Sequence, residues 1–349
     1  MMKKILKFLG IVAIVALLAF ALSVFLSRRE SEPPALDRFE PGAEYQAADG
    51  HPAKITSEEA SFAYALPGST KLRYYHARSG EIKELDLLKP GRPTLVATIK
   101  PLATYISWSH DGSELIAQVG TEYRSYNLSK NTSQVLEKNI SRPVFSKTTD
   151  DVAYLYFNTA TGEGTISITN SRFKEFKTIL KTRLDNWEIQ WNDSRRLSLI
   201  ATSTTTKLDS LFLLNTQEKD LTQLIDGQGN LEARWSPDGR MLLYSYQART
   251  GTKLFLLSLE TGTTTDVSIS GNASECTWTS DSTTAYCAVE QGKEDSIMKI
   301  ALDGKAELVL SPDEAGFVDA RELLYVHSVP GLVFKNFKDG RLYLLKLQK

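Results

Sequence analysis

The sequence has few of the residues that build metal and catalytic sites. It contains two cysteines and four histidines among 349 residues, and the histidines lack the H-x-x-H and H-E-x-x-H spacings of zinc sites. The G-x-S-x-G elbow of serine hydrolases and the D-x-D-x-D-G run of calcium loops are also absent. We therefore predict no catalytic residue, no metal site and no cofactor.

An excess of basic residues is missing as well. Lysine and arginine number 41 against 42 acidic residues, for a net charge of −1 at pH 7. Proteins that bind nucleic acids meet the phosphate backbone with basic stripes, so we expect no nucleic-acid partner. The 42% hydrophobic and 24% charged residues are typical of a globular protein with a sizeable core.

One long apolar run lies near the N-terminus. Residues 8–26 are nineteen uncharged, mostly apolar residues, and as a helix they would span roughly 28 Å, close to the thickness of a bilayer core. A cleaved signal peptide is the alternative, because Ala19-Phe20-Ala21 mimics a cleavage site, but the apolar run continues past it. We predict a retained transmembrane signal-anchor helix.

The flanks of this run suggest an orientation. Residues 1–7 would form a short cytoplasmic tail, and residues 27–49, with three prolines among charges, would form a linker. The basic residues on the two sides nearly balance, so the positive-inside rule gives only a weak preference for the N-terminus inside. The expected location is a cell membrane, single-pass, with residues 50–349 on the extracytoplasmic side.

A repeat fills residues 50–349. In LEARWSPDGRMLLYSY, Trp235 is followed by a polar turn and by apolar residues seven and nine positions later, on one face of a strand. The same spacing recurs from seven anchor residues, which we predict to pack between sheets: Ile55, Trp108, Phe145, Trp191, Trp235, Trp278 and Phe317.

The turns of the clearest repeats carry an aspartate, which glycine follows in two of them. These residues stabilise a tight hairpin, since aspartate bonds to the local backbone and glycine accepts a left-handed conformation. We assign this structural role, rather than a ring of ligand carboxylates, to Asp111, Gly112, Asp238, Gly239 and Asp281.

The period of the repeat indicates the fold. Successive anchors lie 53, 37, 46, 44, 43 and 39 residues apart, and each repeat has room for four strands. This period is close to the roughly 40 to 50 residues of a propeller blade. We predict an all-β β-propeller of about seven four-stranded blades, with six possible because Trp191 and Phe317 fit the spacing poorly.

The two cysteines occupy opposed positions of one predicted hairpin. Cys276 lies two residues before Trp278 and Cys287 nine after it. A cross-strand disulfide is geometrically reasonable there, and two buried thiols are the alternative. A disulfide would indicate an oxidising compartment.

The segments SWSHDGSELIA, RWSPDGRMLLYS and TWTSDSTTAY resemble the WD40-like repeats of TolB-type β-propellers. The resemblance implies a propeller that binds partners, and for many members an extracytoplasmic location. We therefore expect a non-catalytic, membrane-anchored module of the cell envelope that binds a protein or acts as a scaffold, and not an enzyme.

An enzyme remains the alternative. A lyase-like or glycosidase-like propeller would have its site at the axis, where charged side chains of perturbed pKa converge, whereas a binding module would show a broad patch on its rim.

Overall fold

The computed structural model describes residues 50–89, 91–292, 294–311 and 318–347. The predicted tail, transmembrane helix and linker (residues 1–49) and the predicted anchor Phe317 lie outside the described residues. Within the described ranges, no helix has the length and apolar character needed to cross a membrane.

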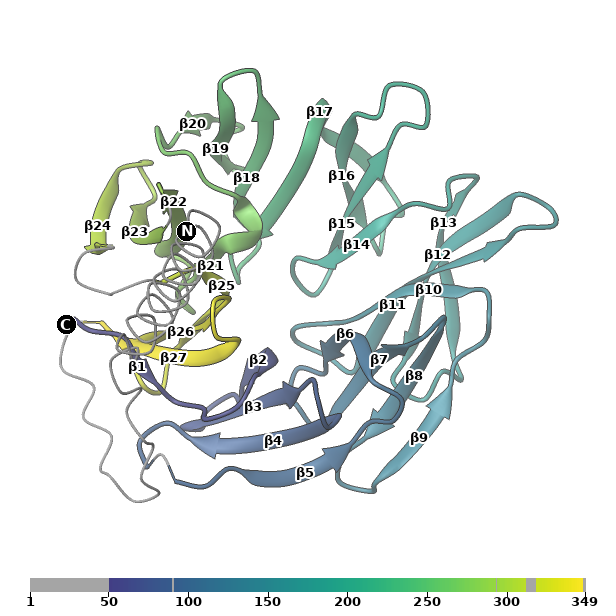
Figure 1. The fold of residues 1–349 in the computed structure, drawn as a ribbon. Helices are drawn as coiled ribbons and strands as arrows, with labels where there is room; N and C mark the ends of the chain where they lie inside the picture. The colour runs from purple at the N-terminus through teal and green to yellow at the C-terminus, as the bar shows by residue number, and fades with distance from the viewer. Residues whose placement is uncertain (1–49, 90, 293, 312–317, 348–349) are drawn as a thin grey trace, which may run out of the picture. The chain divides into compact units, whose positions relative to one another are not determined.

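The described chain folds almost entirely into antiparallel strands (Figure 1). Three sheets follow one another in sequence, each with four consecutive strands. Their strands are β2 (Ser61–Ala65), β3 (Lys71–His76), β4 (Glu81–Asp86) and β5 (Thr94–Thr98); β6 (Ala103–Trp108), β7 (Glu114–Val119), β8 (Glu122–Asn127) and β9 (Thr132–Val135); and β10 (Ile140–Phe145), β11 (Asp151–Asn158), β12 (Glu163–Asn170) and β13 (Phe176–Thr182).

A seven-stranded sheet comes next, and one long strand joins its two halves. This strand, β17, pairs with its predecessor through its first half and with its successor through its second half. The sheet contains β14 (Glu188–Trp191), β15 (Arg196–Thr202), β16 (Asp209–Asn215), β17 (Leu221–Trp235), β18 (Met241–Ala248), β19 (Gly251–Ser258) and β20 (Thr264–Asp266).

Two further four-stranded sheets complete the described chain, preceded by the short 3-10 helix η1 (Ala273–Glu275). One contains β21 (Cys276–Trp278), β22 (Thr284–Gln291), β23 (Glu294–Ala301) and β24 (Ala306–Leu310). The other contains β25 (Ala320–Val326), β26 (Gly331–Asn336), β27 (Arg341–Lys346) and, from the start of the described chain, β1 (Ala53–Lys54).

The inner strands contact one another in sequence around the ring, and β14 and β17 are linked through the seven-stranded sheet that contains both. Contacts join β25 to β2, β2 to β6, β6 to β10, β10 to β14, β17 to β21, and β21 to β25. Figure 1 shows these strands at the inner ends of sheets arranged around a common centre. This arrangement is a β-propeller, so the expected fold class is confirmed.

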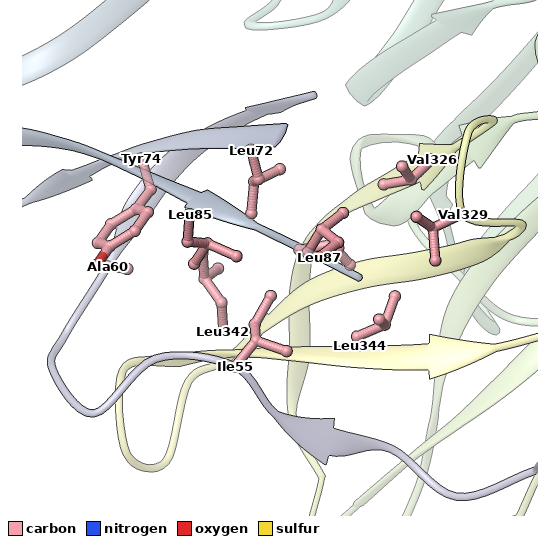
Figure 2. Close-up of a cluster of buried hydrophobic side chains, with 11 residues drawn as sticks. Ile55, Ala60, Leu72, Tyr74, Leu85, Leu87, Val326, Val329, Leu342 and Leu344 are labelled. Atoms are coloured by element: carbon pink, nitrogen blue, oxygen red, sulfur yellow. The ribbon is translucent and has the colours of Figure 1, made fainter. Parts of the chain in front are cut away.

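The two ends of the propeller close on each other through a shared sheet and a shared core. Ala53 of β1 pairs with Leu344 of β27, so the N-terminal strand completes the C-terminal sheet. Figure 2 shows the buried cluster between this sheet and the β2–β5 sheet, to which Leu72, Tyr74 and Leu342 contribute. Burial of such side chains stabilises the fold by roughly 1.5–3 kcal/mol each.

Five predicted anchors are the last residues of inner strands: Trp108 of β6, Phe145 of β10, Trp191 of β14, Trp235 of β17 and Trp278 of β21. Two of the tryptophan indoles tie neighbouring sheets together. Trp108 donates to the carbonyl of Phe62 (2.9 Å) and Trp278 to that of Arg234 (3.1 Å).

The first anchor falls in a different place from the one that we predicted. Ile55 follows β1, the outermost strand of its sheet, and not an inner strand. The equivalent of Trp235 is Ala65, because the amide of Leu66 bonds across its hairpin to Lys71 as the amide of Ser236 bonds to Met241. An alanine gives no aromatic signal, so the sequence pattern was extended to the wrong residue.

The aspartates of the hairpins lie in tight turns, as their sequence pattern indicates. Asp111 accepts a hydrogen bond from the amide of Ser113 (2.9 Å), and Asp238 accepts one from the amide of Arg240 (3.1 Å). Asp281 does the same for Thr283 (3.1 Å). Gly112 and Gly239 adopt φ of 73° and 68°, the left-handed region that glycine enters at low cost.

The two cysteines are directly opposed in the β21–β22 hairpin. Cys276 and Cys287 are register partners and form a disulfide with an S–S distance of 2.01 Å. Both are fully buried, and Cys276 directly follows η1.

Candidate functional site

A cavity of about 600 Å³ opens among the inner strands β6, β10, β14 and β17 and is bounded by η1. It is the best candidate site because several sheets converge on it and because its volume falls within the size range of ligand pockets. Its charged lining residues are Arg142, Lys147, Glu188, Glu232 and Arg234.

Strand alternation explains why charges line this cavity. On β17, Leu231, Ala233 and Trp235 are buried between sheets, so the two residues between them, Glu232 and Arg234, project from the opposite face. β14 follows the same rule, with Ile189 and Trp191 buried and Glu188 and Gln190 in the cavity wall. A repeat built for packing thus presents polar residues at one and three positions before Trp191 and before Trp235.

The helix η1 holds two of the charged side chains in place. Arg234 donates through Nη2 to the carbonyl of Ser274 (2.8 Å), and the amide of Ser274 donates to Oε2 of Glu232 (3.0 Å). One residue of η1 therefore fixes a cation and a carboxylate that lie two positions apart on β17.

Arg142 reaches the cavity from an irregular strand. The pairing of β10 with β11 shifts between Ser141 and Val144, and Arg142 adopts φ of 52°, in the left-handed region. A non-glycine residue pays an energetic cost there, and bulges near functional sites redirect side chains. The bulge thus brings a cation into the cavity wall.

The cavity lowers the pKa of its lysine. Lys147 and Arg234 are both exposed at the cavity wall, where nearby protein atoms still displace part of the surrounding water. Desolvation and, second, the positive charge of Arg234 lower the pKa of Lys147 to about 8. Desolvation also lowers the pKa of Arg234, which the nearby Glu232 and Glu188 oppose. Lys147 therefore exists in part as a neutral amine near neutral pH.

Aromatic side chains form the rest of the wall. Tyr105 donates its hydroxyl to the carbonyl of Pro143 (3.1 Å) and packs edge-on against Tyr123, with ring centroids 6.3 Å apart. Burial raises the pKa of Tyr105 to about 12. The wall therefore combines flat apolar rings, which suit sugar rings or other planar surfaces, with charged groups.

The described residues do not supply a metal site. They contain no group of three histidine, cysteine, aspartate or glutamate side chains placed to hold an ion. In the cavity, two glutamates face three cations, a set that would repel a divalent ion. The chemistry available is that of an amine with a lowered pKa beside two guanidinium groups.

A second hollow of about 580 Å³ lies on β11–β13, with Tyr156, Glu163, Lys181 and Arg183 in its wall. It includes no residue of the inner strands. We therefore take the cavity at the inner strands as the functional one.

Comparisons with known proteins show the fold but no family. No family model matches the chain, and no curated protein matches its sequence. An oligogalacturonate lyase in complex with manganese superposes with a TM-score of 0.65 at 13% identity, over 85% of this chain and 93% of that one. The oligogalacturonate lyase of Vibrio parahaemolyticus gives 0.62 at 10% identity, over 85% and 94%.

Other propellers superpose as well. The β-propeller domain of the trilobed protease from Pyrococcus furiosus, described as having an open velcro topology, gives a TM-score of 0.55 at 11% identity over 83% of this chain and 94% of that domain. A TolB protein from Acinetobacter baumannii gives 0.49 at 13% identity, over 70% and 62%. These identities establish likeness of fold alone.

The comparison corrects two expectations. The predictions of a non-catalytic binding or scaffold module and of a protein that is not an enzyme are wrong, because the structures that superpose over most of the chain with TM-scores above 0.6 are lyases. The findings favour the alternative of an enzyme with an axial site, whose expected feature was a cavity of converging charges with perturbed pKa.

The sequence pattern predicted the packing residues around this site but not its charged residues. Phe145, Trp191 and Trp235 line the cavity, whereas the disulfide and the turn aspartates do not. The missed residues carried a usable signal: Glu188 and Glu232 lie three positions before an anchor, and Arg234 lies one before. Charged residues at these positions of a packed inner strand must face the axis.

Proposed function

We propose that this protein is a β-propeller lyase that cleaves an acidic oligosaccharide in the cavity lined by Lys147, Arg142 and Arg234. The observation that carries the proposal is Lys147, a lysine with a pKa of about 8 beside Arg234 in a cavity at the inner strands. The superposition with two oligogalacturonate lyases supports it at the level of the fold.

The reaction class follows from these groups. In a β-elimination, neutral Lys147 takes the proton from the carbon next to the carboxylate of a uronate unit, and the electrons form a carbon–carbon double bond as the neighbouring glycosidic C–O bond breaks. The proton passes from the ammonium, directly or through water, to the departing oxygen. The products are an unsaturated uronate and a shortened sugar chain, with no oxidant needed.

The arginines make the proton removable. A uronate carboxylate normally disfavours loss of the neighbouring proton, because negative charge builds up on it. Arg234, held by Ser274, and Arg142, placed by the bulge, can neutralise this charge in a site where protein replaces much of the water. In the proposed step, Arg142 and Arg234 carry the countercharge to the carboxylate.

We also propose seven blades. The β14–β17 and β17–β20 halves of the long sheet each supply four strands if β17 is counted in both, since its residues before Gly229 pair with β16 and the later ones with β18. An experimental structure would test this count.

The proposed location is the extracytoplasmic side of a membrane, with residues 8–26 as the anchor. The disulfide between Cys276 and Cys287 supports an oxidising compartment, where acidic envelope polysaccharides would also be accessible. Protease digestion of intact spheroplasts tests this placement.

The function is tested by incubating the full-length protein, purified in detergent, with oligogalacturonate and following the ultraviolet absorbance of the unsaturated product. Lys147→Met should reduce kcat by at least about 100-fold, the usual contribution of a general base. Lys130→Met, at an exposed turn, serves as the matched control and should leave the rate unchanged. A Lys147→Met protein as active as the wild type would refute the assignment.

A further inference from the structure

A third hollow shares part of its wall with the proposed active site. It measures about 430 Å³, and its wall consists of Asn230, Leu231, Glu232, Gln247, Thr252 and Asn272. Leu231 and Glu232 also line the larger cavity, so the two hollows share a wall on β17. Asn272 directly precedes η1, whose Ser274 lines the larger cavity.

The third hollow differs in its chemistry from the cavity that contains Lys147. Three of its six lining residues carry a carboxamide, one carries a hydroxyl, and none carries a positive charge. Carboxamides both donate and accept hydrogen bonds, as the neighbouring hydroxyls of a sugar ring do. A second carboxylate would meet no cation there and would face Glu232.

The wall of this hollow is fixed by hydrogen bonds between its own elements. Thr252 of β19 donates to Oε1 of Gln247 of β18 (3.2 Å), and the carbonyl of Thr252 accepts from Ser270 (3.0 Å). Asn230 adopts φ of 50° at the point where the β17–β18 register shifts. This backbone is uncommon for a residue other than glycine and again redirects a side chain.

We propose that the hollow is a second sugar subsite. It binds a hydroxyl-rich, uncharged unit next to the acidic unit held by Arg142 and Arg234, so that the ligand is an acidic oligosaccharide of two or more units. The inference rests on the proposed function for the identity of the first unit. Glu232, which lies in both walls and is held by the Ser274 amide, marks the junction between the two units.

The test measures binding rather than catalysis. The Lys147→Met protein, which should not consume its ligand, is titrated by calorimetry with galacturonate, with digalacturonate and with digalacturonate methyl-esterified on one unit. The affinity should increase from galacturonate to the half-esterified disaccharide, which should bind more tightly than the unesterified one.

The subsite variant carries Gln247→Ala and Asn272→Ala in the same background. Two lost hydrogen bonds should weaken binding of the half-esterified disaccharide by roughly tenfold, while the affinity for galacturonate stays the same. Gln134→Ala on β9, an exposed residue distant in sequence from both walls, is the control and should change neither affinity. Thermal unfolding confirms that all variants are folded.

The outcomes separate the two proposals. Length-dependent binding that the subsite variant loses supports the subsite even if no lyase activity is found. Lyase activity together with equal affinity for galacturonate and both disaccharides overturns the subsite and leaves the function standing. Equal weakening of all three ligands in the subsite variant also overturns it, because a separate subsite cannot affect the single unit.

Discussion

Two arcs of the inner ring have the same topology but differ in how their charged side chains are paired. The cavity arc, formed by β10, β14 and β17, presents Arg142, Lys147 and Arg234 to open space. The closed arc, formed by β21, β25 and β2, uses its charges internally.

The closed arc shows where its charges go. Arg321 bonds to Asp319 (2.8 Å) and pairs with Glu275, while Glu322 accepts from the amide of Phe62 in the next sheet (2.6 Å).

The cations of the cavity arc have no such partners among the described residues. In the part of the chain that the structure describes, no carboxylate forms a salt bridge with Arg142 or Lys147. Unpaired cations carry a desolvation cost, and a fold keeps them where they meet a ligand. The difference between the arcs therefore locates function within a repeated scaffold.

The largest expected effect tests whether the arcs share one kind of core. Trp235, in the cavity arc, and Trp278, in the closed arc, are both buried, and each indole donates a hydrogen bond. Trp235→Ala and Trp278→Ala should each lower the free energy of unfolding by about 3–5 kcal/mol, as measured by urea denaturation. A much smaller loss at Trp235 would show that the cavity arc is held together differently.

A smaller effect concerns a buried carboxylate beside the closed arc. Asp295 of β23 accepts a hydrogen bond from the amide of Ala320 of β25 (2.6 Å) and is only 6% exposed. Desolvation, aided by the charges of Asp319 and Glu290, raises the pKa of Asp295 to about 6 from its ordinary 3.8. The folded protein therefore holds this proton between pH 4 and 6 more tightly than the unfolded chain does.

The contribution of Asp295 to the free energy of unfolding should therefore decrease as the pH rises. The stabilisation is complete below pH 3.8 and is lost as the pH rises through about 6, for a total of roughly 3 kcal/mol. Asp295→Asn keeps an acceptor for Ala320 and should remove this part of the slope in urea denaturation between pH 4 and 7. The same slope in both proteins would mean that another group causes it.

The fold could be predicted from the sequence because the packing residues recur in each blade, whereas the functional residues do not. Trp108, Trp191, Trp235 and Trp278 recur since each ends an inner strand, and this regularity was enough to predict a propeller. The prediction of an anchor at Ile55 was wrong because the true anchor position, Ala65, carries an alanine in place of an aromatic. The pairing of β1 with β27, across nearly the whole chain, leaves no signal in the local pattern either. Ring closure depends on partners that no local pattern records.

The site was harder to predict for a related reason. Arg142 and Lys147 lie in and just after β10, Arg234 lies on β17, and only the ring brings these two segments to one cavity. Trp187 shows a similar limit: it lies off the repeat spacing, so the pattern does not predict its burial, yet it is buried and donates to Thr182 (2.8 Å). Spacing along the chain identifies faces of strands, but the convergence of charges requires the closed structure.

The smallest expected effect addresses the cavity arc directly. Because Arg234 helps to lower the pKa of Lys147, Arg234→Gln should raise that pKa and move the alkaline rise of kcat/KM, near pH 8 in the wild type, to higher pH. Arg142→Gln is the matched control, since it removes a cation from the same wall but not the one that acts on Lys147. Both variants should lose activity by weakening the hold on the substrate carboxylate, but only Arg234→Gln should shift the profile. A shift of equal size in both would mean that the cavity lowers the pKa of Lys147 through its general positive field, and the cavity arc would then act as one charged surface rather than through a specific pair.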